Sequence, residues 1–141
     1  MTLIRGENAG PELQIRHNVS LAPLTTLELG GTAHAFAEVG TVSTARQAVQ
    51  WAGRHNLPFV VVGGGSNIVV ADQGYAGLGL HVGIRGVETE YDGDRVLVTA
   101  CAGEAWDELV ASTVADGLSG LESLSGIPGW VGATPIQNVG A

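Results

Sequence analysis

The chain has 141 residues, of which 45% are apolar and 14% are charged, a composition that excludes intrinsic disorder and predicts a globular protein. Its formal charge is −8 and all 6 basic residues are arginines, so neither nucleic acid nor an anionic membrane is an expected partner. The single cysteine, Cys101, excludes an internal disulfide and a multi-cysteine metal site.

Residues 1–17 are polar, contain glycine and proline, and show no sustained period, so we expect a flexible leader there. They lack the apolar core of a signal peptide. Nowhere does the chain contain the roughly 20 consecutive apolar residues of a membrane span. We therefore expect a cytoplasmic protein.

The first regular elements are predicted between residues 33 and 62. The sequence AHAFAEV at 33–39 favours a strand, and apolar residues recur at helical spacing from Val42 to Ala52. The short β-branched run FVVV at 59–62 follows a proline and predicts a buried strand.

Three more strands are predicted at 68–71, 78–82 and 96–102, the last one after the turn sequence DGD. Helical spacing resumes after Glu104, and Gly117 is a suitable helix stop. The pattern alone indicates an α+β or α/β architecture in which strands dominate the middle of the chain.

The sequence GGGSN at residues 63–67 directly follows the strand expected at 59–62. Glycine adopts positive φ at little steric cost, so successive amides can turn into one concavity and form an anion nest. Serine and asparagine add neutral donors. In a chain without lysine, this loop is the best candidate for holding a pyrophosphate.

Two other phosphate-binding motifs do not match this loop. A P-loop needs lysine followed by serine or threonine after its last glycine. A dinucleotide fingerprint read from Gly63 requires glycine or alanine where Ile68 stands, and it should open a helix. A plain turn between two strands is the alternative that the pattern leaves open.

The second motif is SGIPGWVGATPIQNVGA at residues 125–141. Its glycines allow close approach of the backbone, and Ile127 and Ile136 can cover the face of a planar ring. The polar rim of such a ring can be satisfied by three side chains, which are Thr134, Gln137 and Asn138. An isoalloxazine ring has these requirements, and an irregular core-packing loop is the alternative.

No pattern in the chain indicates a metal site or a catalytic group. The four histidines, at positions 17, 34, 55 and 81, are too dispersed for metal ligands. Of the three tryptophans, Trp130 is the one expected near a ligand, because it lies inside the glycine-rich tail.

Three stretches together resemble the UDP-N-acetylenolpyruvoylglucosamine reductases, which are UDP-N-acetylmuramate dehydrogenases. They are NVSLAPLTTLELGGTA at 18–33, VVGGGSNIVV at 61–70 and GLESLSGIPGWVGATPIQNVGA at 120–141. The third is the most specific. The resemblance implies an α+β FAD-binding domain of the vanillyl-alcohol oxidase (PCMH) type, with two small α+β subdomains.

On this resemblance, residues 18–84 form the first subdomain and residues 85–141 part of the second, with the substrate domain absent. FAD is expected to bind non-covalently. The implied cofactor-binding residues are Gly63, Gly64, Gly65, Ser66, Asn67, Ile127, Pro128, Gly129, Gly132, Thr134, Ile136 and Gln137. Thr26 and Gly31 are placed, less specifically, in an early loop near the cofactor.

The resemblance also implies a reaction in peptidoglycan synthesis. The family passes hydride from NADPH to the flavin, and then to the enolpyruvyl double bond of the UDP-sugar. Its serine proton donor, arginine and glutamate have no matching motif here, since they lie beyond the equivalent of Ala141. We therefore expect a truncated chain with no catalytic residue and no reductase activity of its own.

Two alternatives remain open from the sequence. The first is another flavoprotein oxidase of the same superfamily. These oxidases often attach the flavin through a histidine near the glycine-rich loop, and no histidine lies between Asn56 and Leu80. The second alternative is a non-catalytic flavin-binding module.

Overall fold

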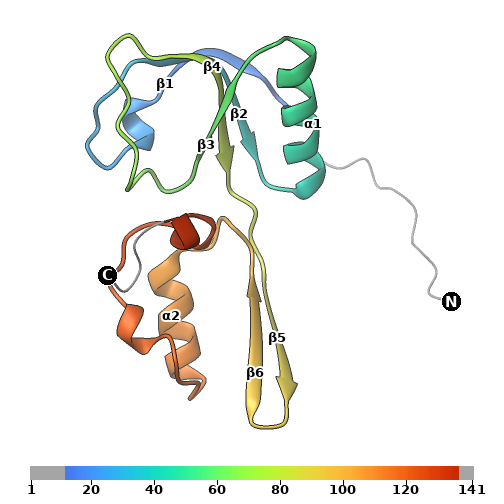
Figure 1. Ribbon diagram of the computed structural model, residues 1–141, viewed down its shortest axis with the longest axis vertical. Coiled ribbons are helices and arrows are strands. Elements are labelled where there is room, and N and C mark those ends of the chain that lie inside the picture. The colour runs from blue at the N-terminus through green and yellow to red at the C-terminus, as the bar shows by residue number, and fades with distance from the viewer. Residues whose placement is uncertain (1–11, 137–141) are drawn as a thin grey trace, which may run out of the picture.

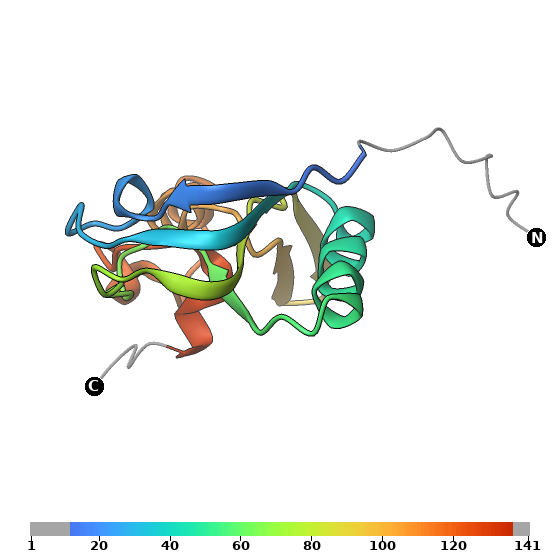
Figure 2. The ribbon, with the colours of Figure 1, turned by 90° about the horizontal axis from the view of Figure 1, so that it is seen from above.

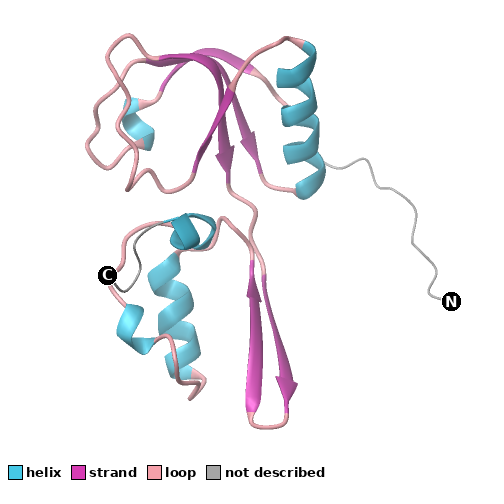
Figure 3. Cartoon of the chain, in the orientation of Figure 1, coloured by secondary structure: helices cyan, strands magenta, loops and turns pink. Residues whose placement is uncertain are grey.

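The computed structural model describes residues 12–136 and divides them into two bodies, one above the other in Figure 1. The first contains a four-stranded sheet, and the second contains a two-stranded sheet with helices to one side (Figure 3). The chain passes from one sheet to the other between Val82 and Val87. We call residues 16–82 the first half and residues 87–136 the second half.

Strands of the first half lie in the spatial order β1-β2-β4-β3. Strand β1 pairs antiparallel with β2, whereas β4 pairs parallel with both β2 and β3. The elements of this half are β1 (Arg16–Ser20), η1 (Ala22–Leu24), β2 (Thr32–Val39), α1 (Val42–Arg54), β3 (Phe59–Val62) and β4 (Tyr75–Val82). The predicted strand at 33–39 and the predicted helix are thus confirmed.

Strand β2 contributes buried residues to both faces of the sheet, where helices lie at opposite sides (Figures 1 and 2), although its His34 and Glu38 are exposed. Towards α1 it contributes Ala35, Ala37 and Val39 to one core cluster. Towards η1 it contributes Ala33 and Phe36 to a second. Small side chains on a parallel strand allow both layers to approach the backbone closely.

Helix α1 begins at a reciprocal cap. The Thr41 hydroxyl accepts from the Thr44 amide at 3.1 Å, and the Thr44 hydroxyl accepts from the Thr41 amide at 3.2 Å. Two amides at the start of the helix are therefore satisfied. The buried face of α1 consists of Thr44, Ala48 and Ala52. Ala48 and Ala52 belong to the helical spacing seen in the sequence, whereas Val42 and Val49 of that spacing are exposed.

Two strand predictions in the first half need correction. The run at 59–62 is a strand, but it lies at the edge of the sheet, and Phe59 is 45% exposed. Residues 68–71 form no strand. They belong to the crossover from β3 to β4, and parallel strands require such a connection to return to the opposite end of the sheet. The amide of Gly31 donates to the Ala71 carbonyl at 3.0 Å and holds this crossover.

The amino-terminal end also differs from expectation. Strand β1 begins at Arg16, so the last two residues of the expected leader, Arg16 and His17, belong to the sheet. They pair with Phe36 and Ala35 of β2. Nothing in the local sequence period indicates this pairing, because the strand is mostly exposed.

The second half contains β5 (Val87–Asp92), β6 (Arg95–Ala100), α2 (Trp106–Ala115), η2 (Glu122–Leu124) and η3 (Val131–Ile136). Strand β6 confirms the prediction at 96–102, whereas β5 was not predicted. Helix α2 ends at Ala115 with Asp116 as its C-cap, and Gly117 follows with φ of +73°, as expected for a helix stop. The core of this half is formed by Trp106, Leu109 and Val110.

Candidate functional site

The triple-glycine loop leaves β3 at the edge of the first sheet. Only Gly65 of the three glycines has positive φ, +73°, so Gly63 and Gly64 do not use the freedom that the sequence allows them. A Cβ on Gly65 would overlap the Leu24 carbonyl. The Thr26 amide donates to the Gly65 carbonyl at 3.0 Å. The positive φ and the lack of room for a Cβ both require glycine at position 65.

Amide groups of this loop remain available for a ligand. Within residues 12–136, the amides of Gly63, Gly64 and Gly65 donate no hydrogen bond to a backbone carbonyl. Buried amides in folded proteins are nearly always paired. Gly65 is buried, so its amide, which has no partner among the described residues, is a feature that a bound acceptor would satisfy.

The glycine-rich tail is held by a carboxylate at the start of α2. The Gly126 amide and the Ser125 hydroxyl both donate to Oδ1 of Asp107 at 2.7 Å. These two bonds, the Gly126 amide first, lower the pKa of the Asp107 carboxyl below its ordinary value. An acidic side chain in the first turn also suits the helix dipole.

Further hydrogen bonds fix the tail before it reaches the first half. The Trp106 ring nitrogen donates to the Leu124 carbonyl at 2.8 Å, and the Trp106 amide donates to the Gly129 carbonyl at 3.0 Å. The Gly132 amide donates to the Ala102 carbonyl at 3.0 Å. The path of the tail is therefore set mainly by main-chain pairing.

The two motifs meet where the tail crosses the triple-glycine loop. The Ser66 hydroxyl donates to the Pro128 carbonyl at 3.3 Å. A cavity of about 280 Å³ lies alongside, and both motifs line it. Its lining consists of Val60, Val61, Val62, Gly63, Gly64, Gly65, Ser66, Asn67, Ile68, Ala133 and Ile136. Residues far apart in sequence thus share one site.

The "FAD binding domain" family matches residues 33–141, which is most of the chain. The chain belongs to this FAD-binding domain family. Its resemblance to the reductases named above is confirmed as well. The UDP-N-acetylenolpyruvoylglucosamine reductase of Thermobifida fusca is 51% identical over 125 residues, which cover 88% of this chain and 35% of that protein.

A second relative, the reductase of Saccharopolyspora erythraea, is 50% identical over 123 residues, covering 86% of this chain and 34% of that protein. The crystal structure of the Thermus caldophilus reductase matches with a TM-score of 0.66 and 31% identity, over 86% of this chain and 41% of that one. The α+β fold expected for an FAD-binding domain is therefore confirmed. The chain spans about 35% of the curated relatives it matches.

The chemistry of the cavity fits part of FAD. None of its lining residues carries a charged side chain, so no carboxylate opposes a phosphate there. Glycine amides without a backbone partner among residues 12–136 and the neutral Asn67 side chain supply donors, and valines and Ile136 supply apolar surface. A volume of about 280 Å³ is at the lower limit for ligand pockets, so it suits only part of a dinucleotide.

Some of the predicted site residues line the cavity, and others lie elsewhere in the fold. Residues 63–67 and Ile136 line it, and Pro128 contacts it through Ser66. Ile127 instead packs against the α2 core, so its predicted place over a ring face receives no support. The Thr134 hydroxyl donates to the Trp130 carbonyl at 3.4 Å. Gln137 lies outside the described residues.

Two of the remaining predicted residues serve the backbone path. The Gly129 carbonyl accepts from Trp106, and a Cβ on Gly132 would lie 2.7 Å from that of Ala102. Sequence reasoning missed five lining residues, which are Val60, Val61, Val62, Ile68 and Ala133. Strand β3 is apolar at all four positions, so its pattern does not show which side chains face a cavity, and nothing local distinguishes Ala133.

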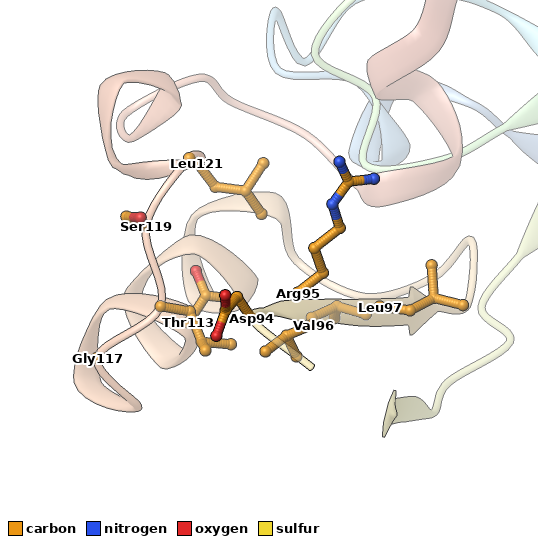
Figure 4. A pocket seen from close by; sticks show the side chains of 11 residues that line it. Asp94, Arg95, Val96, Leu97, Thr113, Gly117, Ser119 and Leu121 are labelled. Atoms are coloured by element: carbon orange, nitrogen blue, oxygen red, sulfur yellow. The ribbon is translucent and has the colours of Figure 1, made fainter. Parts of the chain in front are cut away.

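A larger hollow of about 660 Å³ lies between β6 and the segment after α2 (Figure 4). It includes Arg95, Leu97 and Leu121, and none of the predicted site residues lines it. Strand β6 pairs only with β5 among the described strands, so this hollow follows an open sheet edge. The smaller cavity matches the family chemistry better.

Other classes of site receive no support in residues 12–136. No group of three or more histidine, cysteine or acidic side chains is placed to hold a metal ion. No helix in the same residues has the length and apolar character needed to cross a bilayer.

Proposed function

We propose that this chain is the FAD-binding part of an NADPH-dependent reductase that converts UDP-N-acetylenolpyruvoylglucosamine to UDP-N-acetylmuramate in peptidoglycan synthesis. The observation that carries the proposal is the cavity shared by the triple-glycine loop and the tail. The names of the relatives support the reaction. Bound FAD would supply the hydride chemistry, with NADPH as the reductant.

Each side of the cavity has its own role in this proposal. Amides of Gly63, Gly64 and Gly65 bind the pyrophosphate, the Asn67 side chain adds a neutral donor, and Ser66 fixes the loop to the tail through its hydrogen bond to Pro128. Backbone donors suit this acidic chain, because its formal charge is −8 and it has no lysine to bind phosphate. The tail, with Pro128, Gly129, Gly132, Thr134, Ile136 and Gln137, approaches the flavin.

Non-covalent binding separates this proposal from the flavoprotein oxidases. The test is to purify the chain, add FAD, remove the excess and record the visible flavin absorption before and after denaturation. We expect a yellow protein that releases free FAD when it unfolds. Flavin that stays attached after denaturation would identify an oxidase, and a colourless protein at saturating FAD would contradict FAD binding.

We propose the reductase reaction for a complete enzyme of the length of the relatives, of which this chain would be the FAD-binding part. We also propose that the chain alone turns over no substrate and acts in the cytoplasm. Consumption of NADPH is the measurement, with FAD and the UDP-enolpyruvyl sugar present. Steady oxidation that depends on the sugar would contradict the absence of catalytic residues, and a flavin-binding chain without turnover is the expected result.

A further inference from the structure

Trp130 belongs to the second half through its backbone. It forms an antiparallel bridge with Ala105, the residue before α2. The Trp106 amide donates to the carbonyl before it, that of Gly129, at 3.0 Å, and the amide after it, that of Val131, donates to the Glu104 carbonyl at 2.9 Å. The main chain on both sides of Trp130 is therefore fixed to the segment that leads into α2.

Its side chain, by contrast, lies against the first half. A Cβ built on Gly64 would lie 3.1 Å from Cδ1 and 3.2 Å from Nε1 of the indole, and one built on Gly63 would lie 3.9 Å from Cε3. The indole thus occupies the side of the loop toward which a side chain at 64 would project. Glycine at 64 is explained by this ring and not by its φ.

A second contact supports the indole from strand β4. Its ring centroid lies 5.0 Å from that of His81, with 33° between the planes. The His81 ring in turn stacks on Phe36 at 6.2 Å, and its side chain is only 14% exposed. Phe36 is itself in the core of the first half. A row of three rings therefore connects the tail to the first core.

Few other contacts join the two halves. Within residues 12–136, no helix or strand of one half packs extensively on one of the other. Other contacts between the halves in the described residues include the Ser66 to Pro128 hydrogen bond and those of the linker at 83–86, where the Gly103 amide donates to the Ile84 carbonyl at 2.8 Å and the Arg85 guanidinium lies 6.0 Å from the centre of the Trp130 ring. The relative orientation of the halves consequently depends strongly on Trp130.

We propose that Trp130 is a positioning residue that locks the orientation of the two halves and so sets the shape of the cavity between the triple-glycine loop and the tail. Its relevance to FAD rests on the proposed function. The indole holds the loop on its Gly64 side, and the cavity forms with Ala133 and Ile136 of the same tail. Loss of the ring frees the halves to rotate and weakens FAD binding.

The test compares Trp130→Ala, Trp130→Phe and the control Trp51→Phe. Trp51 lies in helix α1, and its ring stacks on His55, the C-cap residue of that helix. Residual dipolar couplings of the backbone amides are measured without FAD, and FAD affinity is measured by titration. We expect one alignment tensor for both halves in the unaltered chain, in Trp130→Phe and in Trp51→Phe. Trp130→Ala is expected to need two tensors and to bind FAD about tenfold or more weakly.

The outcomes separate this proposal from the FAD assignment. A single tensor in Trp130→Ala overturns the proposal whatever its FAD affinity, and two tensors with unchanged affinity overturn the link to the cofactor. If the unaltered chain binds no FAD, the proposed function fails, yet the couplings still decide whether Trp130 locks the halves. Should Trp130→Ala not fold, His81→Ala removes the support of the ring and is expected to need two tensors.

Discussion

The two halves of the molecule reach their structures by different means. In the first half, strands far apart in sequence pair in parallel, and Ala33, Ala35 and Ala37 of β2 are completely buried. In the second half, a hairpin of consecutive strands and one helix form a small core, and all of β5 is exposed. The first half therefore depends on long-range packing and the second on local contacts.

This difference extends to the two loops of the site. The triple-glycine loop is shaped by close packing, because a side chain at Gly65 would overlap Leu24. The tail is shaped by hydrogen bonds, two of them to Asp107. A binding site composed of both loops should respond differently to packing mutations and to changes of pH.

The largest effect is expected from Phe36→Ala. Phe36 is 1% exposed and its loss leaves a cavity between Leu21 and Ala33, so the free energy of unfolding should fall by about 3–5 kcal/mol. Leu97→Ala is the matched control, because Leu97 is 60% exposed in the hairpin and should change stability by less than about 0.5 kcal/mol. Urea unfolding measures both, and equal losses would contradict the contrast between the halves.

A smaller loss of stability is expected from Gly65→Ala. Positive φ and overlap with the Leu24 carbonyl should together cost about 2–3 kcal/mol. FAD affinity should fall more than about tenfold, because the amides of the loop move. Gly63→Ala is the control for folding, since its nearest neighbour would be 3.9 Å away. Unchanged flavin retention in Gly65→Ala would refute the role of the loop.

The smallest effect is the pH dependence of the tail. Hydrogen bonds from Gly126 and Ser125 lower the pKa of Asp107 in the folded chain below its ordinary value of 3.8. Asp107 therefore adds stability above pH 3.8, and this contribution disappears as the pH falls through the lowered value.

Asp107→Asn should remove this part of the acid destabilisation, and thermal unfolding between pH 2 and pH 7 is the measurement. Glu108→Gln is the control, because the Glu108 carboxylate makes no hydrogen bond within the described residues. A pH profile of Asp107→Asn identical to that of the unaltered chain would exclude the carboxylate as the holder of the tail.

Much of this fold could be predicted from the sequence because the spacing of apolar residues agrees with which side chains are buried. In α1, Ala48 and Ala52 of the predicted apolar spacing lie on the buried face. Residues 68–71 misled because their β-branched run lies in a crossover and not in a sheet: Val70 packs against Gly30, and Val69 is 78% exposed. Strand β5 was missed because it buries no apolar face, although alternation of Val87, Thr89 and Tyr91 before the turn could have indicated it.

For the site, the sequence indicated the loop and the tail but not how they meet. The place of Trp130 between Gly64 and His81 depends on tertiary contacts between three segments, and spacing along the chain does not encode it. Tertiary contacts also explain why the prediction for Ile127, a place over the face of the ring, receives no support. An apolar residue between glycines can face a ligand or a core, and here the α2 core takes it.

The central claim is that the triple-glycine loop and the tail form one FAD site. Titration of the isotope-labelled chain with FAD, followed by amide NMR signals, tests it most directly. We expect the largest shifts at residues 63–67 and 133–136, with little change in 94–98 and 117–121. Shifts concentrated along β6 and the segment after α2, or none at saturating FAD, would contradict the claim.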